Sequence, residues 1–257
     1  MSVETRLALS RVWAEPDVAR LYRYRAPYPP PVFEILRRLI VEPHTILDAG
    51  CGTGALTRHL TELASRVDAV DPSEAMIEEG RRLLGGGDPR IRWIVGPAET
   101  APLEPPYGLI TTGQSLHWMD HGVVMRRFHD ALAPGGRLAA LDIEWEYPPA
   151  WRDKLISIFE RFSSRGPKAF LDIFEDLQRR GLFERHGFQR TSTIPFEQSI
   201  EGFIRALQST SSLSRVTLGE RTAAFAAEVR ALFASLGVDR VAFPVAGSVV
   251  WGRPLRP

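Results

Sequence analysis

The stretch TILDAGCGTGALT, residues 45–57, decides the fold. Its first part is a short apolar run ending in an acid and a glycine, which predicts a buried β-strand over residues 45–50. A helical pattern follows over residues 55–64, so the glycines between them turn a strand into a helix. Ligands of open parallel sheets sit at the carboxyl ends of the strands. The loop over residues 50–54 is therefore the first candidate binding site.

The alternation of strands and helices continues to residue 145, which predicts a parallel sheet covered on both faces. The expected strands are 66–71, 91–96, 108–115 and 137–145, and the expected helices are 29–40, 73–84 and 120–132. Asp120 is a plausible N-cap of the last helix, and residues 133–136 read as a turn. Beyond residue 145, helices are expected over 150–181, 199–208 and 218–236, and strands over 187–198 and 240–253. The core then has about seven strands.

Composition places the chain among ordinary globular proteins. Of its 257 residues, 44% are hydrophobic and 25% are charged, with a net charge of +1. This balance does not favour a nucleic-acid partner or an anionic membrane surface. The chain has one cysteine, Cys51, and no apolar run that could be a signal peptide or a membrane span. We therefore expect a cytoplasmic protein.

Asp48 bears on which ligand the glycine loop holds. Read loosely, Gly50, Gly52 and Ala55 fit the dinucleotide fingerprint G-x-G-x-x-A. A carboxylate two residues before the first glycine is unfavourable for a pyrophosphate but suits a cationic ligand. S-adenosylmethionine carries an ammonium and a sulfonium and no phosphate. The alternative for Asp48 is a carboxylate that caps the turn.

Asp71 ends the second predicted strand, where a carboxylate can accept hydrogen bonds from both hydroxyls of a ribose. Dinucleotide and S-adenosylmethionine sites share this feature, so Asp71 alone does not distinguish them. It can also help to begin the helix that follows.

Five segments in order resemble the class I S-adenosylmethionine-dependent methyltransferases. They read ILDAGCGTG, VDPSEAMIEEGRR, IVGPAET, LITTGQSLHWMD and LAPGGRLAALDIE. The resemblance is to the small-molecule branch that includes quinone-biosynthesis and trans-aconitate methyltransferases. It is strong over residues 20–145 and weak elsewhere. It implies a Rossmann-like, doubly wound, seven-stranded and mostly parallel α/β sheet, with an antiparallel last strand and helical insertions that form a lid.

The resemblance also implies a cofactor site for S-adenosylmethionine. Its glycine loop would hold the methionine part, its second strand the ribose and the loop after its third strand the adenine. An N-terminal segment would fold over the cofactor. The implied cofactor-binding residues are Tyr24, Arg25, Asp48, Gly50, Gly52, Thr53, Gly54, Asp71, Pro72, Ser73, Met76, Ala98, Glu99, Gln114, Ser115 and Trp118.

His117 is the candidate catalytic residue. The segment GQSLHWMD, residues 113–120, lies at the end of the fourth strand, near the methyl group to be transferred. A histidine there could act as a base near neutral pH, or it could be a structural histidine beside the cofactor. The histidines of the chain show no metal-ligand spacing, so no metal is expected.

The function expected from these motifs is S-adenosylmethionine-dependent methyl transfer to a small-molecule acceptor by in-line displacement. We expect one domain over residues 1–257, with a cofactor-binding core at 20–145. Helical insertions at 146–186 and 199–237 would form the acceptor lid. Two alternatives are a protein that binds S-adenosylmethionine without methyl transfer, and an NAD-dependent oxidoreductase.

Overall fold

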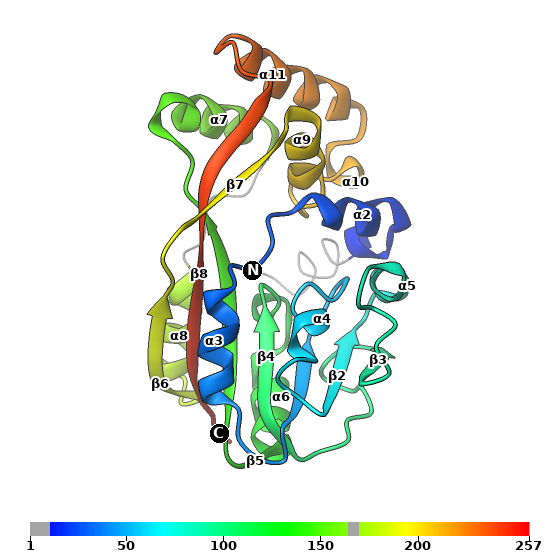
Figure 1. The fold of residues 1–257 in the computed structure, drawn as a ribbon, viewed down its shortest axis with the longest axis vertical. Coiled ribbons are helices and arrows are strands. Elements are labelled where there is room, and N and C mark those ends of the chain that lie inside the picture. The colour runs from blue at the N-terminus through cyan, green and yellow to red at the C-terminus, as the bar shows by residue number, and fades with distance from the viewer. Residues whose placement is uncertain (1–10, 164–169, 257) are drawn as a thin grey trace. The chain divides into compact units, whose positions relative to one another are not determined.

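The parallel strands expected from the first half of the sequence form the central sheet of the protein (Figure 1). The computed structural model describes residues 11–163 and 170–256. They divide into two units. The sheet unit comprises residues 28–144, 170–192 and 247–256. The helical unit comprises residues 11–27, 145–163 and 193–246.

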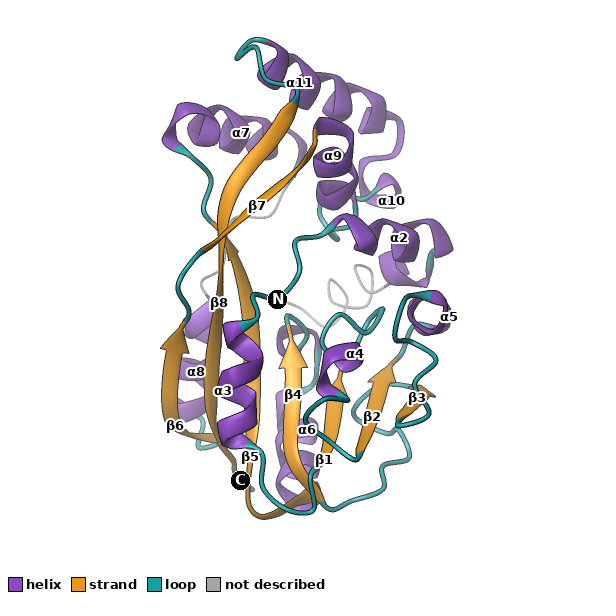
Figure 2. Ribbon diagram, in the orientation of Figure 1, coloured by secondary structure: helices purple, strands orange, loops and turns teal. Residues whose placement is uncertain are grey.

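The sheet unit has the strand order β3-β2-β1-β4-β5-β8-β6 (Figure 2). Strands β1 to β5 pair in parallel, and β6 is antiparallel to β8. The predicted α/β class, a mostly parallel sheet with an antiparallel last strand, is thereby confirmed. The strands are β1 (Thr45–Ala49), β2 (Arg66–Asp71), β3 (Ile91–Val95), β4 (Tyr107–Gly113), β5 (Leu132–Trp145), β6 (Phe183–Arg190), β7 (Ile194–Ser199) and β8 (Arg240–Pro254).

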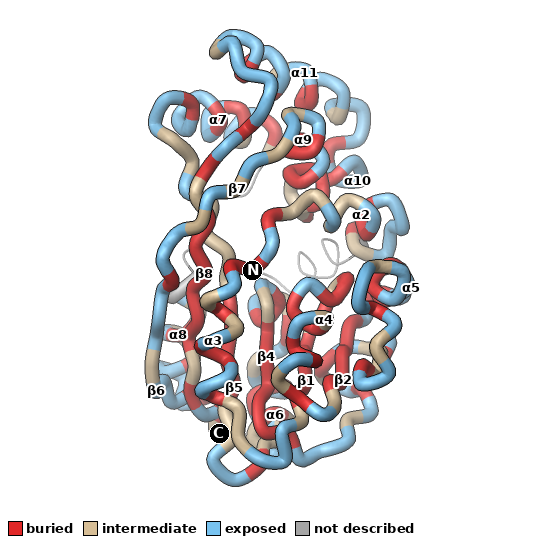
Figure 3. The backbone as a smooth tube through the Cα atoms, viewed as in Figure 1, coloured by how far each residue is buried: buried red, intermediate tan, exposed pale blue. Residues whose placement is uncertain are grey.

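Helices cover both faces of this sheet, because successive strand residues point to opposite sides. Leu47 packs with helices α6 and α8, whereas its neighbour Ile46 packs with α3. The strands between these layers are largely buried (Figure 3). The helices of the sheet unit are α3 (Pro31–Leu39), α4 (Thr57–Leu60), α5 (Glu74–Arg82), the 3₁₀ turn η3 (Leu116–Trp118), α6 (His121–Ala131) and α8 (Phe170–Arg179).

The structure differs from the sequence prediction in the strand expected over residues 187–198. It is two strands, β6 and β7, which pair with different parts of the long strand β8. Between them, Thr191 exchanges hydrogen bonds with Gly247, where β8 passes from one unit to the other. The described chain therefore has eight strands rather than seven. Two smaller differences are that the helix expected over 55–64 is only the short α4, and that β5 begins at Leu132, before the expected turn.

The helical unit is held by an aromatic cluster around Phe243 of β8, which is 3% exposed. Trp145, Tyr147 and Phe203 lie with ring centroids 5.4–5.8 Å from that of Phe243. Its helical elements are η1 (Arg11–Ala14), α2 (Pro16–Leu21), η2 (Tyr22–Tyr24), α7 (Pro149–Phe162), α9 (Ile200–Gln208), α10 (Arg215–Leu218), η4 (Gly219–Arg221) and α11 (Thr222–Ala234).

Only part of the first predicted insertion belongs to the helical unit, whereas the second belongs to it entirely. Residues 146–163 and 199–237 belong to the helical unit, and residues 164–169 lie outside the described chain. Residues 170–186 belong to the sheet unit, where Phe174 and Leu177 of α8 are fully buried in the sheet's core. That part of the predicted insertion is therefore core structure.

The predicted N-cap of α6 is present. The Asp120 side chain accepts hydrogen bonds from Gly122 N and Val123 N, at 3.0 and 3.4 Å. Replacing Asp120 with alanine removes this cap and is expected to lower the free energy of unfolding by about 1 kcal/mol. Urea unfolding measures the change, and Asp120→Asn, which keeps a capping oxygen, is the control. Equal stability of the alanine variant and the wild type would contradict this role.

Candidate functional site

The carboxyl ends of β1, β2 and β4 meet at one edge of the sheet unit. Asp48 of β1 lies opposite Ala69 of β2 on one side and Thr111 of β4 on the other. Asp71 and Gly113 end the two neighbouring strands. The topology thus brings together the loops that follow these strands, as expected for a ligand site in an open parallel sheet.

The glycine loop leaves β1 in a conformation that requires its glycines. Gly50, Gly52 and Gly54 have φ values of 71°, 54° and 74°, in the left-handed region that side chains disfavour. At Gly50 a side chain would also clash with a neighbour, since an added Cβ would lie 2.4 Å from Ser115 Cβ. Thr53, within the loop, is buried. Because these three positions are glycines, the backbone of the loop can lie close to the strand ends.

Asp48 lies in β1 just before this loop, and its side chain accepts hydrogen bonds from two threonines of the protein. The hydroxyl of Thr57 donates to Oδ2 at 2.6 Å, and the hydroxyl of Thr111 donates to Oδ1 at 3.0 Å. The residue is 1% exposed. Burial raises the pKa of Asp48 to about 6, although these hydrogen bonds act in the opposite direction. Asp48 therefore presents a buried charge below the loop rather than an open side chain.

Asp71 joins the glycine loop to the start of α5. Its Oδ2 accepts a hydrogen bond from Gly52 N and its Oδ1 one from Ser73 N, both at 2.8 Å. Burial raises the pKa of Asp71 to about 6, and the nearby charge of Asp48 contributes in the same direction. Each carboxylate oxygen can accept more than one hydrogen bond. Asp71 can therefore still receive donors from a ligand.

The predicted ribose and adenine residues lie around the starts of α5 and α6. Ser73 caps α5 by accepting from Met76 N, and Pro72 beside it is exposed. Met76 is 1% exposed and Ala98 is 6% exposed, so both are packed within the protein. Glu99 Oε1 accepts from Asp120 N at 2.8 Å. In this structure the Glu99 carboxylate therefore supports the start of α6.

The segment after β4 is tied to both neighbouring strands. Ser115 Oγ donates to Ala49 O at 2.7 Å, which holds this segment to the end of β1. Gln114 Nε2 donates to Asp142 Oδ1 of β5 at 2.7 Å. His117 is exposed in η3, with its ring centroid 4.8 Å from that of the half-buried Trp118. The structure thus brings the predicted residues of this segment to the edge that holds the glycine loop.

Tyr24 and Arg25 belong to the helical unit, and their described contacts lie within it. Arg25 donates from Nε to Ser209 Oγ at 2.7 Å and from a terminal nitrogen to Ser209 O at 2.8 Å. Arg205 donates to the Tyr24 hydroxyl at 2.5 Å. Arg25 thus makes two hydrogen bonds to the C-cap residue of α9, and a cofactor contact of Tyr24 or Arg25 stays a prediction.

Sequence reasoning missed three residues that shape this edge: Thr57, Thr111 and Asp142. The threonines hold Asp48, and Asp142 holds Gln114. Thr57 could have been inferred as the polar residue at the start of the helix after the loop. Thr111 and Asp142 have no local signal, because only the strand order and register bring them beside their partners.

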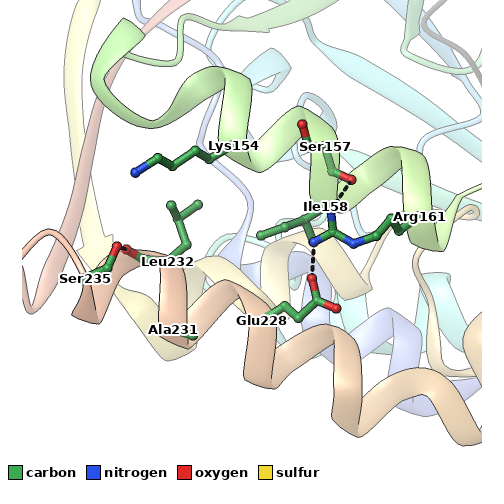
Figure 4. A pocket seen from close by; sticks show the side chains of 8 residues that line it. All are labelled: Lys154, Ser157, Ile158, Arg161, Glu228, Ala231, Leu232 and Ser235. Atoms are coloured by element: carbon green, nitrogen blue, oxygen red, sulfur yellow. Dashed lines mark hydrogen bonds and ion pairs between the residues drawn. The ribbon is translucent and has the colours of Figure 1, made fainter.

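The helical unit carries a groove of about 400 Å³ between α7 and α11 (Figure 4). Arg161 of α7 reaches across it to form an ion pair with Glu228 of α11. Lys154, Ser157 and Ser235 also line it. Both partners of the ion pair are substantially exposed, so this groove is the surface seam between two packed helices.

Within residues 11–163 and 170–256, no three metal-ligating side chains gather into a possible metal site. Nor does this part of the chain contain a helix with the length and apolar character needed to cross a bilayer.

Comparison with known proteins identifies the central part of the chain. Residues 46–136 match the family model described as a methyltransferase domain. Malonyl-[acyl-carrier protein] O-methyltransferase from Anoxybacillus flavithermus is 36% identical over 87 residues, which are 33% of each chain. Trans-aconitate 2-methyltransferase from Pseudomonas aeruginosa is 35% identical over 127 residues, 48% of this chain and 42% of the relative. The chain thus matches less than half the length of each of these relatives.

A solved structure extends the similarity over most of the chain. A candidate type II methyltransferase from Anaeromyxobacter dehalogenans superposes with a TM-score of 0.67 and 25% identity. The match covers 89% of this chain and 97% of that one. Residues 46–136 are therefore a methyltransferase domain, and the resemblance drawn from the ordered motifs is confirmed.

Proposed function

We propose that this protein transfers a methyl group from S-adenosylmethionine to a small-molecule acceptor by in-line displacement. The observation that carries the proposal is the pair of buried carboxylates, Asp48 and Asp71, on either side of the glycine loop. The Asp48 carboxylate opposes the binding of a pyrophosphate there, whereas a ligand with a cationic centre and a free ribose suits the pair. Asp48 thus disfavours the NAD-dependent alternative.

The proposed cofactor site assigns a part of the ligand to each loop. The glycine loop would receive the methionine end, where the buried charge of Asp48 favours the ammonium group through space. Asp71 would accept hydrogen bonds from the ribose hydroxyls. Pro72, Ser73, Ala98 and the backbone of Glu99 would border the ribose and adenine. These roles are supported by where the residues lie around the strand ends.

The chemistry needs mainly alignment, because the sulfonium already activates the methyl carbon and leaves as a neutral thioether. A protein contributes to such a displacement by positioning and by excluding water. Trp118 would form a wall beside the sulfonium. His117 is proposed as a base for acceptors that must lose a proton, and it is exposed at the correct edge for that role.

The proposed methyl acceptor is a small-molecule metabolite. The relatives are named for malonyl-[acyl-carrier protein] and for trans-aconitate, which supports a metabolite rather than a nucleic acid. The net charge of +1 agrees with this. We propose that helices of the helical unit, within 146–163 and 199–237, serve as the acceptor lid. A cytoplasmic location is proposed from the single cysteine.

The test is a transfer assay with methyl-labelled S-adenosylmethionine and the small-molecule fraction of a cell extract. We expect a labelled product, which mass spectrometry would identify. Binding of S-adenosylhomocysteine with no labelled product from any extract would instead support a binding protein without methyl transfer. A reduced nicotinamide product in a parallel NAD assay would support the oxidoreductase.

Cofactor affinity is expected to fall as the pH decreases through about 6. The pKa values of Asp48 and Asp71 are both raised to about 6 in the free protein. A ligand that needs the two ionised carboxylates lowers these pKa values on binding, so protonation competes with it. Calorimetry with S-adenosylhomocysteine at pH 5 and pH 7.5 measures the effect. Equal affinity at both pH values would contradict the assigned roles.

A further inference from the structure

Gln114 and Asp142 form a polar pair at the carboxyl ends of β4 and β5. Gln114 follows β4 directly, and its backbone N–H donates to Leu141 O of β5 at 2.9 Å. Its side chain donates to Asp142 Oδ1 at 2.7 Å. Two bonds from one residue thus fasten the end of β4 to β5, beside Ser115, which ties the segment after β4 to the end of β1.

Gln114 has an uncommon backbone conformation at this pair. Its φ is 54°, in the left-handed region, which is uncommon for residues other than glycine. Such conformations persist where the surrounding structure enforces them, and they cluster at functional sites. Thr112, two residues before Gln114 in β4, is buried, so the end of β4 is held in the core.

The hydrogen bonds of Asp142 leave one of its oxygens available. Oδ1 accepts both from Gln114 Nε2 and from Ile143 N, at 2.7 and 2.9 Å. Oδ2 accepts no hydrogen bond from the described residues, and it is not sealed from solvent. A half-buried carboxylate near the carboxyl end of β5, beside the end of β4, is therefore oriented by one oxygen and has the other oxygen without a described partner.

We propose that Asp142 Oδ2 accepts a hydrogen bond from the atom to be methylated, so the acceptor is a hydroxyl or a neutral amine and not a carboxylate. This inference rests on the proposed function. In the step, a lone pair of the acceptor oxygen or nitrogen forms the bond to the methyl carbon. The carbon–sulfur bond breaks, and its electron pair stays on the sulfur. The acceptor's proton passes to Asp142 rather than to His117, and Asp142 later releases it to water.

The electrostatics around Asp142 agree with this role. Burial raises its pKa, with a smaller contribution from the charge of Glu144 on the same strand. A higher pKa makes the carboxylate a better proton acceptor. Glu144 itself pairs with Arg190 and Ser248. A carboxylate acceptor would be repelled by the ionised Asp142 and has no proton to give it.

The test compares Asp142→Asn with the matched control Glu144→Gln in the labelled-methyl assay described above. Asparagine keeps an oxygen for Gln114 but presents a donor in place of Oδ2. We expect Asp142→Asn to lower the transfer rate by about 10²-fold, as for loss of a general base. Its affinity for S-adenosylhomocysteine, measured by calorimetry, should equal that of the wild type. Glu144→Gln removes only the smaller effect of the Glu144 charge on the pKa of Asp142, so it should lower the rate far less than Asp142→Asn does.

The stability of the labelled product in alkali is a second measurement, and a purely structural role of Asp142 would not change it. Methyl ethers and methylamines retain the label in alkali, whereas methyl esters release it as methanol. We expect an alkali-stable label. An alkali-labile label, or a wild-type rate for Asp142→Asn, would overturn the role of Asp142 and leave the proposed function standing. No labelled product from the wild-type protein would overturn both.

Discussion

Replacing Asp71 with asparagine is expected to weaken the binding of S-adenosylhomocysteine by roughly 1–3 kcal/mol, or about five- to 150-fold in Kd. Asp71 supports the site in two ways. It holds Gly52 of the loop and Ser73 of the helix start, and it would accept the ribose hydroxyls. Asparagine has one carbonyl oxygen, so it cannot serve both N–H groups and the ligand. Calorimetry measures the affinity.

The control for Asp71→Asn is Asp88→Asn, which removes a carboxylate paired with Arg90 before β3. It should leave the affinity unchanged. Thermal unfolding of each variant separates loss of the site from loss of the fold. Wild-type affinity in a folded Asp71→Asn protein would contradict the proposal that Asp71 accepts hydrogen bonds from the ribose.

Gly50→Ala is expected to abolish measurable cofactor binding. The backbone of Gly50 is left-handed at φ 71°, and an added Cβ would lie 2.4 Å from Ser115 Cβ and 2.8 Å from its hydroxyl. Ser115 cannot move aside freely, because its hydroxyl is bonded to Ala49 O. The loop must therefore shift away from the strand ends. Loss of binding in calorimetry, with far-UV circular dichroism retained, is the expected result.

Gly135→Ala is the matched control for this change. Gly135 has a similar φ of 79°, but an added Cβ there meets no atom within 4 Å. Both variants carry the cost of a left-handed alanine, about 1 kcal/mol, and only Gly50→Ala adds the clash at the loop. Equal cofactor affinity in the two variants would show that the close approach of Gly50 to Ser115 does not matter.

Local sequence signals predicted the first half of the chain well. The apolar runs gave β1 to β4, and Asp120 marked the start of α6, because these features depend on neighbours along the chain. The split between β6 and β7 was not predictable in this way. Both strands are short and partly exposed, and the break depends on β8, which pairs with each of them in turn.

The same distinction applies to the site. Placing Asp48, Asp71 and the glycines at strand ends required only the strand–loop–helix pattern. The partners of Asp48 required the fold, since Thr111 lies on another strand and meets Asp48 through the parallel register. Arg25 shows the limit most clearly. The resemblance implied a cofactor contact for Arg25, which stays a prediction, whereas its described hydrogen bonds go to Ser209, 184 residues away, and no local signal pointed to that partner.

We propose that the loop over residues 50–54 holds the methionine end of S-adenosylmethionine. Calorimetry of the full chain with S-adenosylhomocysteine and with NAD, under the same conditions, tests it most directly. We expect saturable binding of S-adenosylhomocysteine and no binding of NAD. Binding of NAD without binding of S-adenosylhomocysteine or S-adenosylmethionine would contradict it.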